Sequence, residues 1–172
     1  ITGITSNLGY SLVTSSQLAS RGTEMNLSGF SIKRGQKCRL YFDIGNVSGS
    51  AAYVRLYINN DTTITNYWTQ EGGFSGTSCL SARSNAPNIG YAGNALNSEG
   101  YCNLSWAKGT GYYTWFCQLR RDNTNSLQEY LYIGTTSAVK SSPITSLKIK
   151  LDNGGNFETD SIVELYCFGD WR

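Results

Sequence analysis

The chain has 172 residues, with 14 lysines and arginines against 12 aspartates and glutamates, five cysteines and no histidine. This nearly balanced charge gives no field that would draw the protein to nucleic acid or to an anionic membrane, and no apolar run approaches the roughly 18 residues that span a bilayer. Without histidine there is no Ser-His-Asp or Cys-His nucleophile arrangement, and no cysteine spacing suits zinc. The length suits one domain over residues 1–172.

Strand signals of alternating apolar and polar residues recur along the chain, separated by clusters of Gly, Asn, Ser and Asp. The one plausible helical stretch, Ser15–Arg21, is too short and too polar to count on. The predicted strands are, in chain order, Asn26–Ile32, Leu40–Ile44, Tyr53–Ile58, Tyr112–Leu119, Glu129–Ile133 and Leu147–Leu151. We therefore predict an all-β fold, an antiparallel two-sheet sandwich that is jelly-roll-like and has about eight strands.

Two polar turns each predict a hairpin. Asn59–Asp61 follows an apolar strand, and asparagine and aspartate tolerate positive φ better than other non-glycine residues. Asp152–Asn156 lies between two apolar runs and is expected to close an antiparallel pair.

The stretch Phe74–Gly111 is rich in Gly, Ser, Asn and Ala. A structureless loop of that length is rare in compact domains and usually carries function. Alternatively, Ser78–Ala82 and Tyr101–Trp106 are two ordinary strands with wide connections, and the sequence leaves both interpretations open.

The cysteines favour five reduced thiols, as in a protein made in a reducing cytosol. Cys38, Cys117 and Cys167 sit in strand-like runs, where a reduced cysteine behaves as a small hydrophobe. Cys79 and Cys102 lie in loop-like sequence and are the pair for which a disulfide is conceivable.

Acidic residues are dispersed singly, mostly at turns, where capping and solubility account for them without catalysis. Glu164, between Val163 and Leu165, is expected to face outward or to meet another subunit. Oxygen-rich loops at Asn59–Asp61 and Asp122–Asn125 are weak calcium candidates, for which Asx turns are the better account. We expect no metal, no cofactor and no enzymatic activity.

Aromatic residues are the compositional excess, with 12 Tyr, 4 Trp and 6 Phe. Exposed tyrosine and tryptophan suit stacking on sugar rings or anchoring a protein interface. In Tyr112–Phe116 both faces of the strand are bulky, so one face must cover something besides solvent. The predicted binding surface contains Trp68, Tyr91, Tyr101 and Trp106.

Two segments resemble a β-sandwich module of tailed-bacteriophage virion proteins (tail fibre, tailspike or head fibre). Tyr53–Gln70 carries an N-N-D-T-T-x-T-N-Y-like turn, and Pro143–Gly169 carries G-G-N-F followed by L-Y-x-F-G. The resemblance implies that Phe157 packs back onto the sandwich, that the piece comes from the C-terminal part of a longer virion protein, and that it forms a homotrimer. It also implies synthesis in the host bacterial cytoplasm and display on the particle surface.

The expected function is therefore attachment to a host-surface receptor, most simply a glycan, or decoration of the particle, without nucleic-acid binding or membrane insertion. Departures from the module's pattern are Cys167, where an apolar residue or glycine is commoner, and the extra Asp170–Arg172 tail. The alternative is a carbohydrate-binding, lectin-like module appended to a polysaccharide-degrading enzyme or tailspike. A third hypothesis, a glycosidase acting through paired carboxylates, has no supporting pattern in the sequence.

Overall fold

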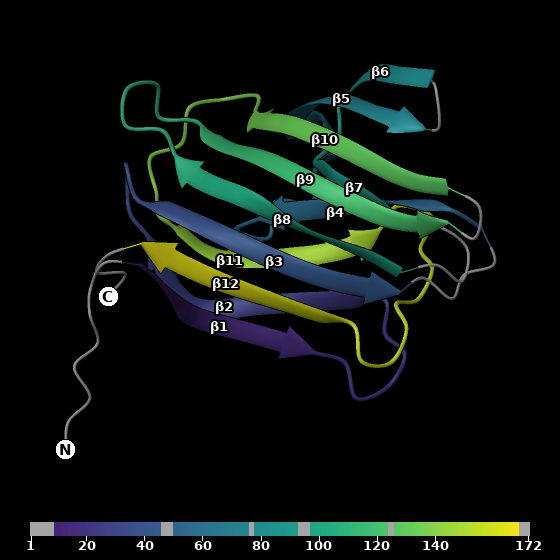
Figure 1. Ribbon diagram of the computed structural model, residues 1–172. Coiled ribbons are helices and arrows are strands. Elements are labelled where there is room, and N and C mark those ends of the chain that lie inside the picture. Colours follow the sequence, from purple (N-terminus) through teal and green to yellow (C-terminus); the bar gives the residue numbers. More distant parts are fainter. Residues whose placement is uncertain (1–8, 46–49, 76–77, 93–96, 124–125, 169–172) are drawn as a thin grey trace.

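Two antiparallel sheets pack face to face in the computed structural model, which describes residues 9–45, 50–75, 78–92, 97–123 and 126–168 (Figure 1). The predicted all-β sandwich is confirmed. The described residues form twelve strands rather than about eight: β1 (Tyr10–Gln17), β2 (Glu24–Ile32), β3 (Lys37–Gly45), β4 (Ala52–Ile58), β5 (Tyr67–Ser75), β6 (Ser78–Ser84), β7 (Asn88–Ala92), β8 (Asn97–Trp106), β9 (Tyr113–Asn123), β10 (Ser126–Thr136), β11 (Ile144–Leu151) and β12 (Ile162–Phe168).

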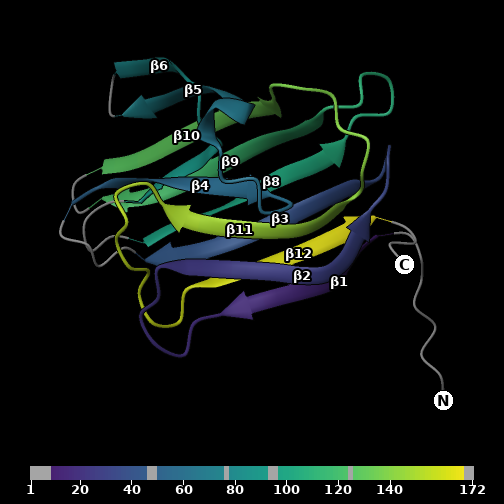
Figure 2. The same cartoon turned by 180° about the vertical axis from the view of Figure 1, so that it is seen from behind.

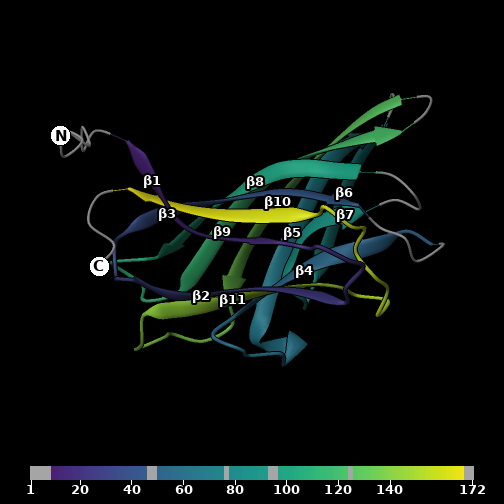
Figure 3. The same ribbon diagram turned by 90° about the horizontal axis from the view of Figure 1, so that it is seen from below.

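The larger sheet has eight strands in the order β1-β12-β3-β8-β9-β10-β5-β6, and the smaller has four in the order β2-β11-β4-β7. Figure 1 views the molecule from the side of the larger sheet, and Figure 2 from the side of the smaller one. Seen from below, the strands of the larger sheet change direction progressively from β12 to β5, so the sheet is strongly twisted (Figure 3).

The stretch Phe74–Gly111 is not one long loop. The interpretation as ordinary strands is confirmed, because Ser78–Ala82 lies in β6 and Tyr101–Trp106 lies in β8, with β7 as a further strand between them. Ser15–Arg21 is not helical either, since Ser15–Gln17 pairs with β12 at the edge of the larger sheet.

Both predicted hairpins are wrong. β4 lies in the smaller sheet and β5 in the larger one, and the same is true of β11 and β12, so both turns carry the chain across the sandwich. Asn59 and Asn60 do adopt positive φ, as expected, but a short 3-10 turn, η1 (Ile64–Asn66), then redirects the chain to the opposite layer. In the second crossing, Phe157 is fully buried and its amide donates to the Gly22 carbonyl, 2.8 Å away, so it packs back as the resemblance implies.

The core lies between the sheets, where strands such as β3, β11 and β12 bury about every second side chain. Its largest fully buried members include Trp115, Tyr67, Tyr132 and Leu56. The polar atoms of these rings have partners: the Trp115 indole donates to the Asn88 carbonyl at 3.2 Å, and the Tyr67 hydroxyl donates to the Asp61 carbonyl at 2.7 Å. This satisfied hydrogen bonding lets large aromatic side chains fill a wide core.

The cysteine prediction is wrong as well. Disulfides join Cys38 to Cys167 and Cys102 to Cys117, so Cys102 does not pair with Cys79, whose side chain lies outside the described residues. All four bonded cysteines point into the core, and each faces its partner directly across neighbouring strands. Pairing of this kind depends on strand order and register, which cysteine spacing does not reveal.

Candidate functional site

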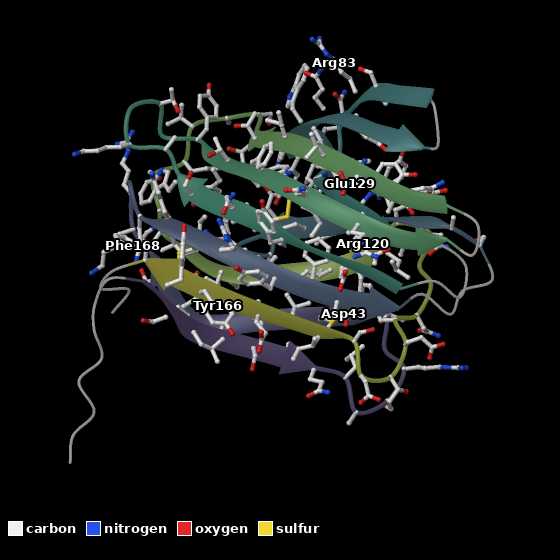
Figure 4. The ribbon with its side chains drawn as sticks, viewed as in Figure 1. Asp43, Arg83, Arg120, Glu129, Tyr166 and Phe168 are labelled. Atoms are coloured by element: carbon white, nitrogen blue, oxygen red, sulfur yellow. A yellow bond between two sulfur atoms is a disulfide. The ribbon has the colours of Figure 1, made fainter. Side chains whose placement is uncertain are left out.

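The outer face of the eight-stranded sheet is the candidate site. Side chains alternate along each strand, so half of them point away from the core, and within the described ranges no element lies over them (Figure 1). Figure 4 shows side chains projecting from this face towards the viewer, among them Asp43, Arg120, Glu129 and Tyr166.

Strand register places the outward side chains in rows across the sheet. One row joins β3 to β6 and contains Arg39, Asn103, Phe116, Ile133, Gln70 and Arg83. The next row, one step along the same strands, contains Lys37, Ser105, Thr114, Thr135 and Trp68. Apolar side chains are therefore bordered by hydrogen-bonding side chains over one continuous area.

These two rows line a groove of about 790 Å³, which we call the aromatic groove. Trp68 is 53 % exposed and Ile133 is 57 % exposed. Phe116, on the strand β9 that lies between β8 and β10, is also exposed and lines the same groove. Exposed large apolar side chains that gather in one hollow indicate a surface made for contact, whereas scattered ones are ordinary.

Arg39 fixes a positive charge at the β3 end of the groove. Its guanidinium donates to Asn103 Oδ1 at 2.9 Å and to the Tyr41 hydroxyl at 3.3 Å. The guanidinium carbon lies 4.6 Å from the centroid of the Tyr101 ring and 5.3 Å from that of Tyr10. The Tyr41 hydrogen bond is the main cause of a raised Arg39 pKa. These contacts hold the fork in place and leave it charged.

A second hollow of about 450 Å³ lies at the other end of the same strands, and most of its charged residues are acidic. It is lined by Asp43, Glu99, Glu129 and Glu164, together with Arg120. Glu164 points outward, as predicted, and accepts a hydrogen bond from the Tyr166 hydroxyl at 3.2 Å. The face thus carries apolar and cationic groups at one end and carboxylates at the other.

The four predicted binding residues do not lie together. Trp68 and Tyr101 share the outer face, separated by β10 and β9. Tyr91 instead projects from β7 in the smaller sheet, beside Tyr53. Trp106 is only 7 % exposed, and its indole donates to the Gly111 carbonyl at 3.1 Å, so it belongs to the core and holds the turn that follows β8.

Sequence reasoning missed Arg39, Tyr10 and Ile133 as members of this face. The bulk on both faces of Tyr112–Phe116 was the sequence signal that pointed to this face, because Phe116 is an exposed outward aromatic residue of that run. The remaining members come from strands that are distant in sequence, so no local pattern connects them.

The oxygen-rich turn at Asn59–Asp61 is engaged internally. The Asn59 amide donates to the Pro143 carbonyl at 2.8 Å, and its oxygen accepts from the Thr145 amide at 2.7 Å. Asp61 accepts from the Asn66 amide at 2.9 Å. These bonds support the local explanation over a calcium site. The side chains of the other candidate loop, Asp122–Asn125, lie outside the described residues.

Within the described part of the chain, no three His, Cys, Asp or Glu side chains gather as a metal ion would need. No helix in that part has the length and hydropathy to cross a membrane. No protein-family model, curated protein or solved structure matches the chain.

Proposed function

We propose that this chain is a non-catalytic attachment domain of a tailed-phage virion protein, and that its aromatic groove binds a glycan on the host surface. The observation that carries the proposal is the groove itself, in which exposed ring and aliphatic side chains lie next to hydrogen-bonding side chains on neighbouring strands. The resemblance of Tyr53–Gln70 and Pro143–Gly169 to virion modules supplies the biological setting.

A sugar ring presents an apolar face of C–H groups and a rim of hydroxyls. Trp68 and Phe116 offer apolar surfaces for the ring face. Gln70, Asn103 and Arg83 stand beside them and offer donors and acceptors for the rim. An open groove with such a lining suits an extended saccharide better than a small enclosed substrate.

We infer a jelly-roll framework beneath this groove. The strands β1-β12-β3-β8 form one four-stranded half opposite β2-β11-β4-β7, and most connections between consecutive described strands cross from one sheet to the other. The added strands β9, β10, β5 and β6 lengthen only the first half, and they carry most of the groove. A rigid sheet that bears the contact residues keeps the groove preformed.

The direct test is a glycan array followed by calorimetry with any saccharide that binds. Trp68→Ala is expected to weaken binding at least about tenfold, because the few anchoring residues of a binding surface, among which tryptophan is enriched, each cost about 2 kcal/mol or more when truncated. Its matched control is Ile64→Ala, an exposed apolar residue on η1, away from the groove. A saccharide that binds equally to the wild type, Trp68→Ala and Phe116→Ala, or the absence of any bound saccharide, would remove the glycan from the proposal.

A homotrimer on the particle surface completes the proposal, since virion fibres commonly have three-fold symmetry. Light scattering of the isolated domain at micromolar concentration tests it. A species with three times the chain mass of 18.9 kDa supports the trimer, and a strictly monomeric species contradicts it.

The same groove fits the alternative of a carbohydrate-binding module attached to a polysaccharide-degrading enzyme or tailspike. The parent polypeptide separates the two hypotheses. A fibrous shaft next to this domain supports the attachment protein, whereas a catalytic domain supports the appended module or a tailspike.

A further inference from the structure

At one side of the sandwich, β5 and β6 extend beyond the smaller sheet (Figures 1 and 2). Residues of β5 and β6 line a further pocket, separate from the aromatic groove and from the acidic hollow. Its volume is about 360 Å³. Three tyrosines and one carboxylate line it, with a rim from the edge strand β6: Tyr53 (β4), Tyr91 (β7), Tyr130 (β10), Glu71 (β5), Ser81 and Ala82. We call it the tyrosine pocket.

The three rings form walls that are inclined to each other. Tyr53 and Tyr91 face each other across the β4–β7 pair, with ring centroids 5.2 Å apart and planes at 70°. Tyr91 and Tyr130 have centroids 6.2 Å apart and planes at 45°. Tyr130 is buried, whereas Tyr53 and Tyr91 are half-buried, so the corner they make has a closed back and an open mouth.

Glu71 brings a negative charge to this corner from the inner face of the larger sheet. Its carboxylate accepts a hydrogen bond from the fully buried Tyr132 hydroxyl at 3.3 Å, which holds the side chain in place. Among the described residues, no lysine or arginine forms an ion pair with it. Desolvation, reinforced by Glu71, raises the pKa of Tyr53 to about 12, so the surrounding phenol stays neutral near pH 7.

We propose that the tyrosine pocket binds a quaternary ammonium group, such as the trimethylammonium head of choline. The negative face of an aromatic ring attracts a cation, and several rings around one carboxylate form a cage for it. A quaternary ammonium has no N–H groups to leave unpaired when it enters a corner of rings. A primary ammonium is strongly hydrated and loses more on entry.

The proposal is independent of the aromatic groove. The pocket contains none of the groove residues, and Glu71 points inward from β5 whereas its neighbours Trp68 and Gln70 point outward. A domain with both sites would bind a saccharide chain on its outer face and a cationic substituent at its edge, or either one alone.

The experiment compares choline with 3,3-dimethyl-1-butanol, a neutral molecule of the same shape, by calorimetry or NMR titration of the full chain. Choline is expected to bind at least about tenfold more tightly, because only the cation gains from the rings and from Glu71. Equal affinities, or no detectable choline binding, would overturn the proposal. This comparison uses the unaltered protein and does not depend on how any variant folds.

Variants then locate the site. Glu71→Gln and Tyr91→Leu are each expected to weaken choline binding about tenfold while the far-ultraviolet circular dichroism spectrum stays unchanged. Trp68→Ala is the matched control from the other site, and it should leave choline binding intact. If Trp68→Ala abolishes choline binding and Glu71→Gln does not, the ligand occupies the aromatic groove and the tyrosine pocket is excluded.

Discussion

Replacement of Gly134 by alanine tests the packing under the groove. Gly134 lies on β10 directly opposite Trp115 on β9, and the Trp115 indole covers the place where a side chain at 134 would stand. A Cβ there would come closer than 3.0 Å to three indole atoms, Cε2, Cζ2 and Nε1. The ring would have to move, yet it is 2 % exposed and packs against Tyr67, with 6.0 Å between the centroids.

The expected loss can be estimated from these contacts. Overpacking a tight core costs about 1–3 kcal/mol. Displacing the ring also weakens the bond from its Nε1 to the Asn88 carbonyl, for about 1 kcal/mol more. Alanine in place of glycine in a strand raises the free energy of unfolding by about 0.5–1 kcal/mol, because it reduces the conformational entropy of the unfolded chain. The free energy of unfolding should therefore fall by about 1–3.5 kcal/mol.

Urea unfolding followed by tryptophan fluorescence measures this loss. Gly109→Ala is the matched control, because an added Cβ there meets no atom within 4 Å, and its stability should stay within about 0.5 kcal/mol of the wild type. In a Trp115→Phe background the same alanine should cost less, since a smaller ring leaves room for it. A Gly134→Ala protein as stable as the wild type would refute the reasoning.

Three further predictions concern stability. Removing the disulfide between β3 and β12, which spans 129 residues, should lower the free energy of unfolding in urea by about 2 kcal/mol more than removing the one between β8 and β9, which spans 15. The reason is that the longer closed loop restricts the unfolded chain more. Equal losses would contradict this. Asn59→Ala should lower the free energy of unfolding by about 2–3 kcal/mol, because the Asn59 side chain bridges two segments. Asn60→Gly, at an exposed position of positive φ, should leave stability unchanged or raise it. Similar losses at both sites would contradict these roles. The pKa of Tyr53 is raised to about 12 from an ordinary 10.0, which means that the folded state holds the phenol proton more tightly than the unfolded state does. The contribution of this proton to the free energy of unfolding is therefore complete below pH 10 and is lost between pH 10 and 12. Unfolding measured at successive pH values should show a decline in stability in that window, and a constant stability to pH 12 would argue against it.

The local character of the chain was readable from its residues. Alternation such as Leu40, Phe42 and Ile44 between polar neighbours identifies a strand and its inward face, because successive side chains point to opposite sides. The two-sheet sandwich follows, since such strands must bury one face each. The same periodicity indicated that both faces of Tyr112–Phe116 are bulky, and in the structure Phe116 is the exposed aromatic side chain of β9.

Partnership between strands was not readable. Asn59–Asp61 has the composition of a hairpin turn, and its positive φ values are as expected, but β4 finds its partners in β11 and β7. Turn chemistry determines how the chain bends over a few residues, whereas the neighbour of a strand depends on which apolar faces across the whole molecule remain to be covered.

The sequence by itself therefore determined the strand character of the chain, the inward faces of its clearest strands and the sandwich class, because these depend on a side-chain period of two residues. Only the tertiary structure decided which tryptophan is buried and which is exposed, which cysteines are bonded, and which residues share a surface. Trp68 lies near the start of β5 and Trp106 at the end of β8, both beside polar turns, so their sequence settings are alike. Only their neighbours in space make the first exposed and the second buried. These outcomes rest on contacts between residues far apart in the chain, and a local pattern carries no information about such contacts.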